Sequence, residues 1–289
     1  MNVPTLTACG LSCGYRYVPV VRDVDLEAAP GELTVLAGPN GSGKTTLLRT
    51  LAGLLPPLAG EVLMFGSPVG RLRPRERARR IAYVPQIESP VPGFTVRQAV
   101  WAGRFARLGW IAPGSAEDER ATASALSAVG LLGDAERPAS ELSGGEFRRL
   151  LIARALAQES PVLLLDEPEA HLDARHQEEI LALLLELARG GAAIVATIHD
   201  LNLAALWADR IGVLTEGRLL DLKAPGEAFS GDVVERAFQA GLIRVEHPVT
   251  GRPQFLPISR RPAYTVQEHG GSQAENAEGN DRSTDAQRS

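Results

Sequence analysis

A glycine-rich loop between an apolar segment and a helix-forming segment constrains the fold of this chain more than any other feature. Leu33–Ala37 is an apolar run typical of a buried strand, and residues 43–51 favour a helix. Residues 38–45 between them read Gly-Pro-Asn-Gly-Ser-Gly-Lys-Thr, which matches the phosphate-binding pattern G-x-x-x-x-G-K-[ST] in the strand-loop-helix context that the pattern requires. The sequence therefore predicts a nucleoside triphosphate site in an α/β domain, rather than a glycine-rich loop with a chance lysine.

The chemistry of phosphate binding explains the residue types in this loop. Glycines let backbone N–H groups turn inward around a polyphosphate, and the following helix N-terminus adds a favourable dipole. The Lys44 ammonium would bind the β- and γ-phosphates, and the Thr45 hydroxyl would ligate Mg²⁺. Lys44 is one of only two lysines among 30 basic residues, the other being Lys223, and a planar guanidinium fits this position poorly. We expect the nucleotide to contact Gly38, Pro39, Asn40, Gly41, Ser42, Gly43, Lys44, Thr45 and Thr46.

A pair of carboxylates supplies the second half of the predicted site. The apolar run Val162–Leu165 is followed directly by Asp166 and Glu167. A strand that ends in this way puts Asp166 at the carboxyl edge of a parallel sheet, where bound Mg²⁺ would lie. Glu167 is then placed to polarise an attacking water as a general base. The alternative, two solvated acids at the end of a strand, is less favoured beside a phosphate loop.

The remaining patterns indicate an α/β architecture with a helical insertion. Ile81–Val84, Val162–Leu165 and Ala193–Ala196 read as strands, and the last two lack polar alternation, as in a parallel sheet covered on both faces. Between Gln86 and Ser160 the strand pattern stops, and helices are expected over 95–107, 116–129 and 146–157. Short strands are expected at 6–8, 24–27 and 61–65, and a hairpin at 211–222.

Composition excludes several classes of protein. The net charge of −5 argues against a general binder of nucleic acid or anionic membranes, and we expect the arginine-rich segment 71–80 to be a solvated helix. The only cysteines, Cys9 and Cys13, favour neither a disulfide scaffold nor a zinc module. No signal peptide and no membrane span are expected. The polar composition of 263–289 predicts a disordered tail.

The segment Leu142-Ser143-Gly144-Gly145-Glu146 points to one family. Here the sequence resembles the ATP-binding subunit of ABC transporters, whose signature is LSGGQ or a close variant, and residues 6–222 follow the order of that family's motifs. The resemblance implies a P-loop NTPase (RecA-like) core with a small antiparallel β subdomain and an inserted α-helical subdomain. It implies an ABC ATPase domain over 1–262, with the helical subdomain at about 87–158 and a C-terminal extension at about 226–262.

The resemblance also implies roles for individual residues. Two head-to-tail copies would bind two ATP molecules, with the signature of each copy on the γ-phosphate of the ATP held by its partner. Gln86 would reach the metal and the water, Asp173 would link the two sites, and His199 would contact the γ-phosphate. Tyr15 stands where an aromatic ring stacks on adenine, with Tyr17 as the weaker candidate. The implied groups are then catalytic Glu167, His199 and Gln86; nucleotide-binding Tyr15, Ser143, Gly144, Gly145, Asp173 and the loop; and the Mg²⁺ ligands Thr45, Gln86 and Asp166.

Two residues depart from the family pattern. Glu146 replaces the more frequent glutamine of the signature, a variant that the family tolerates. Glu169 stands at the position after Asp-Glu-Pro where threonine or serine is usual, and it adds a carboxylate near the metal.

Local features favour one branch of the family. Residues 199–204 (HDLNLA), 96–105 (VRQAVWAGRF) and 245–253 resemble importers of iron-siderophore complexes, haem and cobalamin. We expect an ATP-hydrolysing subunit of a bacterial importer for an iron chelate or haem, at the cytoplasmic face of the membrane. Its partners would be a second copy, a membrane permease and, indirectly, a substrate-binding protein, with no nucleic acid. The alternatives are a cobalamin importer subunit and a soluble ABC-type ATPase switch without a permease.

Overall fold

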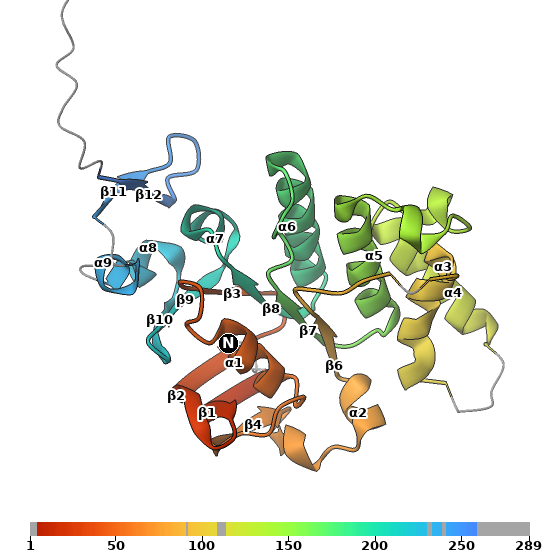
Figure 1. Cartoon of the computed structure of the whole chain (residues 1–289), viewed down its shortest axis with the longest axis horizontal. Helices are drawn as coiled ribbons and strands as arrows, with labels where there is room; N and C mark the ends of the chain where they lie inside the picture. Colours follow the sequence, from red (N-terminus) through yellow and green to blue (C-terminus); the bar gives the residue numbers. More distant parts are fainter. Residues whose placement is uncertain (1–4, 91, 109–113, 230–232, 239–240, 259–289) are drawn as a thin grey trace, which may run out of the picture. The chain divides into compact units, whose positions relative to one another are not determined.

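The computed structural model describes residues 5–90, 92–108, 114–229, 233–238 and 241–258. Its central sheet has six strands in the order β10-β9-β3-β8-β7-β6 (Figure 1). Strands β9, β3, β8, β7 and β6 are parallel and β10 closes the edge antiparallel to β9. The strands are β3 (Leu33–Ala37), β6 (Ile81–Val84), β7 (Val162–Asp166), β8 (Ala193–Ile198), β9 (Arg210–Thr215) and β10 (Arg218–Lys223). The predicted α/β class and parallel sheet are confirmed, as is the hairpin around Glu216 and Gly217.

A second, antiparallel sheet is formed mainly by the N-terminal part of the chain. Its order is β2-β1-β4-β5, with β1 (Leu6–Tyr15), β2 (Val18–Ala28), β4 (Ala59–Met64) and β5 (Ser67–Pro68). The strands expected at 6–8 and 24–27 are present as parts of β1 and β2, which are longer than predicted, and the strand expected at 61–65 corresponds to β4. Register shifts between Ala8 and Gly14 interrupt the β1–β2 pairing and mask a regular alternation in the sequence.

Helices cover both faces of the central sheet. They are α1 (Lys44–Leu51), α2 (Pro74–Ala78), α3 (Val96–Trp101), α4 (Ala116–Ala128), α5 (Gly144–Ala157), α6 (Ala174–Arg189), α7 (Leu201–Trp207), α8 (Pro225–Ala228) and α9 (Val233–Phe238). Short 3₁₀ segments span Val69–Arg71, Ala102–Ala106, Leu132–Asp134 and Ala139–Glu141. No helix in these described ranges has the length and apolar character that a membrane span requires.

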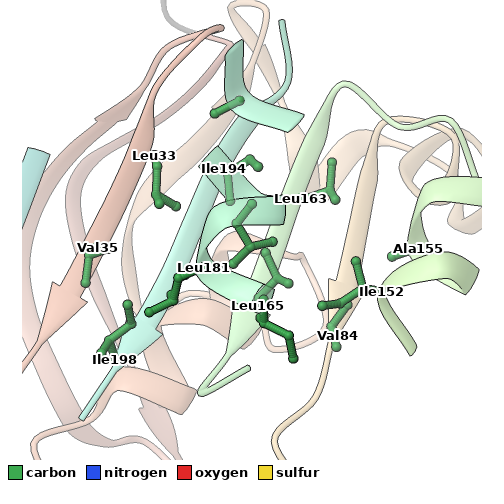
Figure 2. Close-up of a cluster of buried hydrophobic side chains, with 14 of the residues drawn as sticks. Leu33, Val35, Val84, Ile152, Ala155, Leu163, Leu165, Leu181, Ile194 and Ile198 are labelled. Atoms are coloured by element: carbon green, nitrogen blue, oxygen red, sulfur yellow. The ribbon is translucent and has the colours of Figure 1, made fainter. Parts of the chain in front are cut away.

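Two hydrophobic clusters hold the sheet between its neighbours. One joins the antiparallel sheet and α1 to Leu36, Leu164 and Val195 of the central sheet. The other joins the opposite side chains of the same strands to α5 and α6, with Leu165, Leu181 and Ile194 in its centre (Figure 2). Strands β7 and β8 are buried along their whole length, which explains the missing polar alternation.

The segment between β6 and β7 contains helices and no strand in its described part, as expected. The predicted helix over 95–107 is α-helical only to Trp101 and continues as 3₁₀ to Ala106. Gly103 packs so closely against α5 that an added Cβ would lie 2.2 Å from the Arg154 carbonyl oxygen, which favours the narrower 3₁₀ path. Helix α6 was missed, although its buried residues Ile180, Leu181, Leu184 and Ala188 follow the helical period. The domain limits 1–262, 87–158 and 226–262 stay predictions, and residues 263–289 lie outside the described ranges.

A short antiparallel pair ends the described chain. Strands β11 (Leu242–Glu246) and β12 (Pro253–Pro257) pair with each other, and Phe255 packs edge-to-face on Phe229 with ring centroids 4.8 Å apart. Asn202 of α7 attaches this pair to the core, since its amide oxygen accepts the Phe255 N–H at 2.7 Å. Residues 245–253, one of the segments that resemble the importer branch, therefore connect β11 to β12, and the pair packs against α7 and the segment after α8.

Candidate functional site

The phosphate loop joins β3 to α1 through a left-handed turn. Gly43, the residue before α1, has φ 105°, and a Cβ there would lie 2.5 Å from Cγ2 of Val21, so both conformation and space require glycine. No side chain caps α1, and its first turn holds no acidic residue. The amide groups that begin the helix therefore face the loop, where an anion can bind them.

Lys44 points back into this loop. Its side chain is only 5% exposed, and its ammonium donates to the carbonyl oxygens of Gly38 at 2.8 Å and Pro39 at 3.2 Å. The same ammonium lies 3.6 Å from Oε1 of Glu167. The nearby Ser42 hydroxyl is buried and has no hydrogen-bond partner within the described residues. The loop thus holds one buried cation and one buried hydroxyl that a phosphate can bind.

An open cavity of about 380 Å³ lies over the start of α1. It brings together the glycine loop, the segment after β6 and the end of β7. Its lining residues are Val20, Asn40, Gly41, Gly43, Lys44, Thr45, Thr46, Gln86 and Glu167. Eight of the predicted site residues therefore share one cavity. The predicted residues that do not line it are Tyr15, Gly38, Pro39, Ser42, Ser143, Gly144, Gly145, Asp166, Asp173 and His199.

Gln86 and Glu167 are in direct contact. The Gln86 Nε2 donates to Oε2 of Glu167 at 2.5 Å. Glu167 has φ 47°, a left-handed conformation that costs a non-glycine residue about 1 kcal/mol or more and that clusters at functional sites. The carboxylate of Glu167 thus lies between the Gln86 amide and the Lys44 ammonium.

Asp166 is held at the end of β7 by two hydroxyl groups. Thr197, its parallel partner in β8, donates to Oδ1 at 2.8 Å, and the Tyr83 hydroxyl donates to Oδ2 at 3.3 Å. Burial and the neighbouring Asp166 charge raise the pKa of Tyr83 to about 12, so the phenol remains a donor. Thr197 was missed by sequence reasoning, although a lone hydroxyl in an apolar strand was a usable signal.

Arg148 connects α5 to the Gln86 segment. Its guanidinium donates to the backbone carbonyls of Pro85, at 2.9 Å, and Gln86. Burial lowers the pKa of Arg148, while the surrounding carboxylates of Glu169, Asp166 and Glu167 raise it. This role could not be predicted, because helix α5 contains three arginines, at 148, 149 and 154, and no sequence pattern distinguishes Arg148 from the other two.

Glu169 is almost completely buried beside these groups. Only 3% of it is exposed, and its Oε1 accepts the backbone N–H of His199 at 3.1 Å. Its Oε2 is buried and has no hydrogen-bond partner in the described part of the chain. Burial, together with the Glu167 charge, raises the pKa of Glu169 to about 7. The predicted extra carboxylate therefore lies inside the protein and is hydrogen-bonded to the backbone of His199.

The signature segment forms the N-terminus of α5. Ser143 is the N-cap, its hydroxyl accepts the Glu146 N–H at 3.3 Å, and Glu146 accepts the Ser143 N–H at 2.8 Å. The Glu146 carboxylate thus completes a capping box, which lowers its pKa. Asp173 caps α6 and contacts the ring of His176, 2.7 Å from Nδ1. His176, which sequence reasoning missed, also packs on Gly145.

The parallel sheet, the glycine loop at a helix N-terminus and the carboxylates at the end of β7 define an α/β nucleotide-binding ATPase. Residues 21–170 match the family described as ABC transporter. The chain belongs to this family, whose ATP-binding subunits couple ATP hydrolysis to transport.

Individual relatives cover most of the chain. It is 42% identical to the hemin import ATP-binding protein HmuV of Nocardia farcinica over 83% of this chain and 82% of the relative. It is 36% identical to the ferric enterobactin transport ATP-binding protein FepC of Escherichia coli over 92% and 98%. It is 41% identical to the cobalamin import ATP-binding protein BtuD of Halobacterium salinarum over 89% and 64%.

Solved structures are similar in fold. A metal-chelate type ABC transporter in an inward-facing conformation matches 90% of this chain and 98% of its own, with a TM-score of 0.78 and 26% identity. The dimeric structure of MJ0796, a bacterial ABC transporter cassette, matches 76% and 98%, with a TM-score of 0.67 and 28% identity.

Proposed function

We propose that this chain is the ATP-hydrolysing subunit of an importer for an iron chelate or haem. The observation that carries the proposal is the cavity in which Lys44, Thr45, Gln86 and Glu167 meet at the start of α1. Lys44 offers a cation that can bind phosphate, Thr45 a hydroxyl that can ligate a metal, and Glu167 a carboxylate that can polarise water. ATP hydrolysis requires these three groups.

The catalytic centre requires a second copy of the chain. Ser143, Gly144 and Gly145 open α5 outside the cavity formed by their own phosphate loop. Their amides would bind the γ-phosphate of an ATP held by the partner, and Asp173 would link the two sites. The dimeric arrangement of MJ0796 supports this assembly.

Within each site, Glu167 would act as the general base. Its carboxylate is oriented by the Gln86 amide and faces Lys44, so a water beside it would lie next to the bound phosphates. His199, which directly follows β8, would contact the γ-phosphate. Tyr15, 45% exposed at the end of β1, would stack on adenine.

The residues of the site fit Mg²⁺. Thr45 and Gln86 offer hard oxygen ligands in the cavity, and Asp166 lies at the adjacent strand end. Among the described residues, no cluster of three or more His, Cys, Asp or Glu could hold a metal by itself, which suits an ion bound jointly with phosphates. Bound there, Mg²⁺ would neutralise charge on the phosphate oxygens.

The nature of the cargo rests on the relatives. HmuV is named a hemin import ATP-binding protein and FepC a ferric enterobactin transport ATP-binding protein, and both match most of this chain. BtuD supports cobalamin as the second candidate. We place the subunit at the cytoplasmic face of the membrane, on a permease that receives cargo from a substrate-binding protein.

Copurification from membranes tests this proposal. The tagged chain, expressed in its own host, should bring down a multi-helix membrane protein, and the complex in vesicles should accumulate an iron chelate or haem only with ATP. Cobalamin uptake instead would select the second candidate. If no membrane protein accompanies the chain while ATP hydrolysis persists, the alternative of a switch without a permease is correct.

A further inference from the structure

Glu169 joins two segments that the proposed function uses. Its side chain accepts the backbone N–H of His199 at the end of β8, and its own carbonyl oxygen accepts the N–H of Leu172 and the Nε2 of Gln177, both at 3.4 Å. It follows Glu167 by two residues in the turn after β7. One residue therefore ties the His199 segment to the Glu167 turn and to the Asp173 turn.

The surroundings of Glu169 favour a defined position for its carboxyl group. The side chain is 3% exposed, and Arg148 of α5 attracts it while Glu167 repels it. Arg148 is itself held by the carbonyls of Pro85 and Gln86. A buried carboxyl that has a partner for only one of its oxygens among the described residues is costly for stability, so packing alone would favour an apolar residue here.

We propose that Glu169 is a positioning residue for ATP hydrolysis, which holds His199 in register with Glu167 by accepting the His199 backbone N–H. This inference rests on the proposed function. The role explains why glutamate replaces the usual threonine or serine, because the longer side chain reaches from the turn after β7 to the end of β8. The group acts through His199 and need not touch the nucleotide.

Two substitutions separate positioning from packing. Glu169→Met fills the same space without an acceptor, and Glu169→Gln keeps an acceptor oxygen without the charge. Glu169→Met should lower kcat of the full chain for ATP about tenfold, the effect of one lost hydrogen bond in the transition state, with KM for ATP within about twofold. Its Tm should change little, because removal of the orphaned oxygen offsets the loss of the acceptor for the His199 N–H. Glu169→Gln should retain kcat within about threefold.

Hydrogen exchange at the His199 amide provides a second measurement. Protection of this amide should be lost in Glu169→Met and kept in Glu169→Gln. Glu169→Leu serves in place of methionine if that variant unfolds below the assay temperature. Glu178→Met and Glu178→Gln, at an exposed position of α6, are the matched controls and should behave as wild type.

The outcomes distinguish failure of the positioning role of Glu169 from failure of the proposed ATPase function. Wild-type kcat in Glu169→Met, a rise in KM alone, or equal loss in Glu169→Gln and Glu169→Met would overturn the positioning role. An unaltered chain that hydrolyses no ATP would instead refute the proposed function.

Discussion

The imidazole ring of His176 packs against the backbone of Gly145. A Cβ added to Gly145 would come within 3.0 Å of Cδ2 and 3.2 Å of Cγ of His176. The ring cannot easily move away, because Asp173 holds its Nδ1 at 2.7 Å. The N-terminus of the signature helix and the start of α6 are thus in van der Waals contact through a glycine and a histidine.

This contact predicts an energetic coupling between Gly145 and His176. Alanine in the first turn of a helix normally gains about 0.5–1 kcal/mol over glycine. In Gly145→Ala the clash with His176 should cancel this gain, whereas in Gly145→Ala/His176→Ala the gain should appear. A double-mutant cycle from urea unfolding should give a coupling of about 1 kcal/mol.

Gly144 is the matched control for this cycle. It lies in the same helical turn, and a Cβ there would have no atom within 4 Å. Gly144→Ala should change stability equally with and without His176. A cycle at Gly145 that is as additive as the cycle at Gly144 would contradict the contact.

Substitution of Glu167 should separate binding from turnover. Glu167→Gln can still accept the Gln86 Nε2 hydrogen bond but cannot take a proton from water, so kcat should fall at least about 100-fold. The affinity for ATP should stay the same or rise, because a negative charge next to the phosphates is removed. Steady-state ATPase rates and nucleotide titrations measure the two effects, with Glu178→Gln as control. Unchanged turnover would exclude Glu167 as the base.

Substitution by arginine should have opposite effects at the two lysines of the chain. Lys44→Arg must fit a larger, planar group between the carbonyls of Gly38 and Pro39, in a space where the ammonium is 5% exposed. Affinity for ATP should drop at least about tenfold, and hydrolysis should be lost. Lys223→Arg, at the end of β10, should preserve both. Normal ATPase rates in Lys44→Arg would refute the role of the ammonium.

The strands and the loop were predictable because their signals are local. A short apolar run such as Ala193–Ala196 defines a buried strand, and the spacing of Gly38 and Lys44 defines the loop. A lone hydroxyl in an apolar strand marks Thr197 in the sequence, but the partners that Thr197, Arg148 and His176 contact were not predictable. Each contact joins positions at least about 30 residues apart in sequence, and only the pairing of β7 with β8 or the packing of α5 brings them together.

A buried ion network stabilises the helical insertion. Arg104 is 1% exposed, and it donates to Asp118 at 2.8 Å, to Glu159 at 2.7 Å and to the Ala157 carbonyl at 2.7 Å. Hydrogen bonds from Ser115, together with Arg104, lower the pKa of Asp118 to about 2. These contacts connect the 3₁₀ segment to α4 and to the end of α5.

Removal of Arg104 should therefore destabilise the fold strongly. Arg104→Met leaves Asp118 buried without its cation, which costs about 3–5 kcal/mol. Arg107→Met removes a neighbouring arginine that is 36% exposed, and should cost about 1 kcal/mol or less. Urea unfolding of the two variants measures the difference. Equal losses would show that the buried network does not dominate.

The buried carboxyl of Glu169 predicts a pH-dependent stability. Burial raises its pKa from the ordinary 4.5 to about 7, so the folded chain keeps a proton that the unfolded chain releases. Stability contributed by this group is therefore present below pH 4.5 and is lost as the pH rises to about 7.

Glu169→Gln does not titrate, so its stability relative to the unaltered chain should increase over this window by on the order of 3 kcal/mol. Urea unfolding at pH 5 and pH 8 measures the change, with Glu178→Gln as the control that should show none. A relative stability that decreases with pH would mean that Arg148 lowers the pKa of Glu169 more than burial raises it.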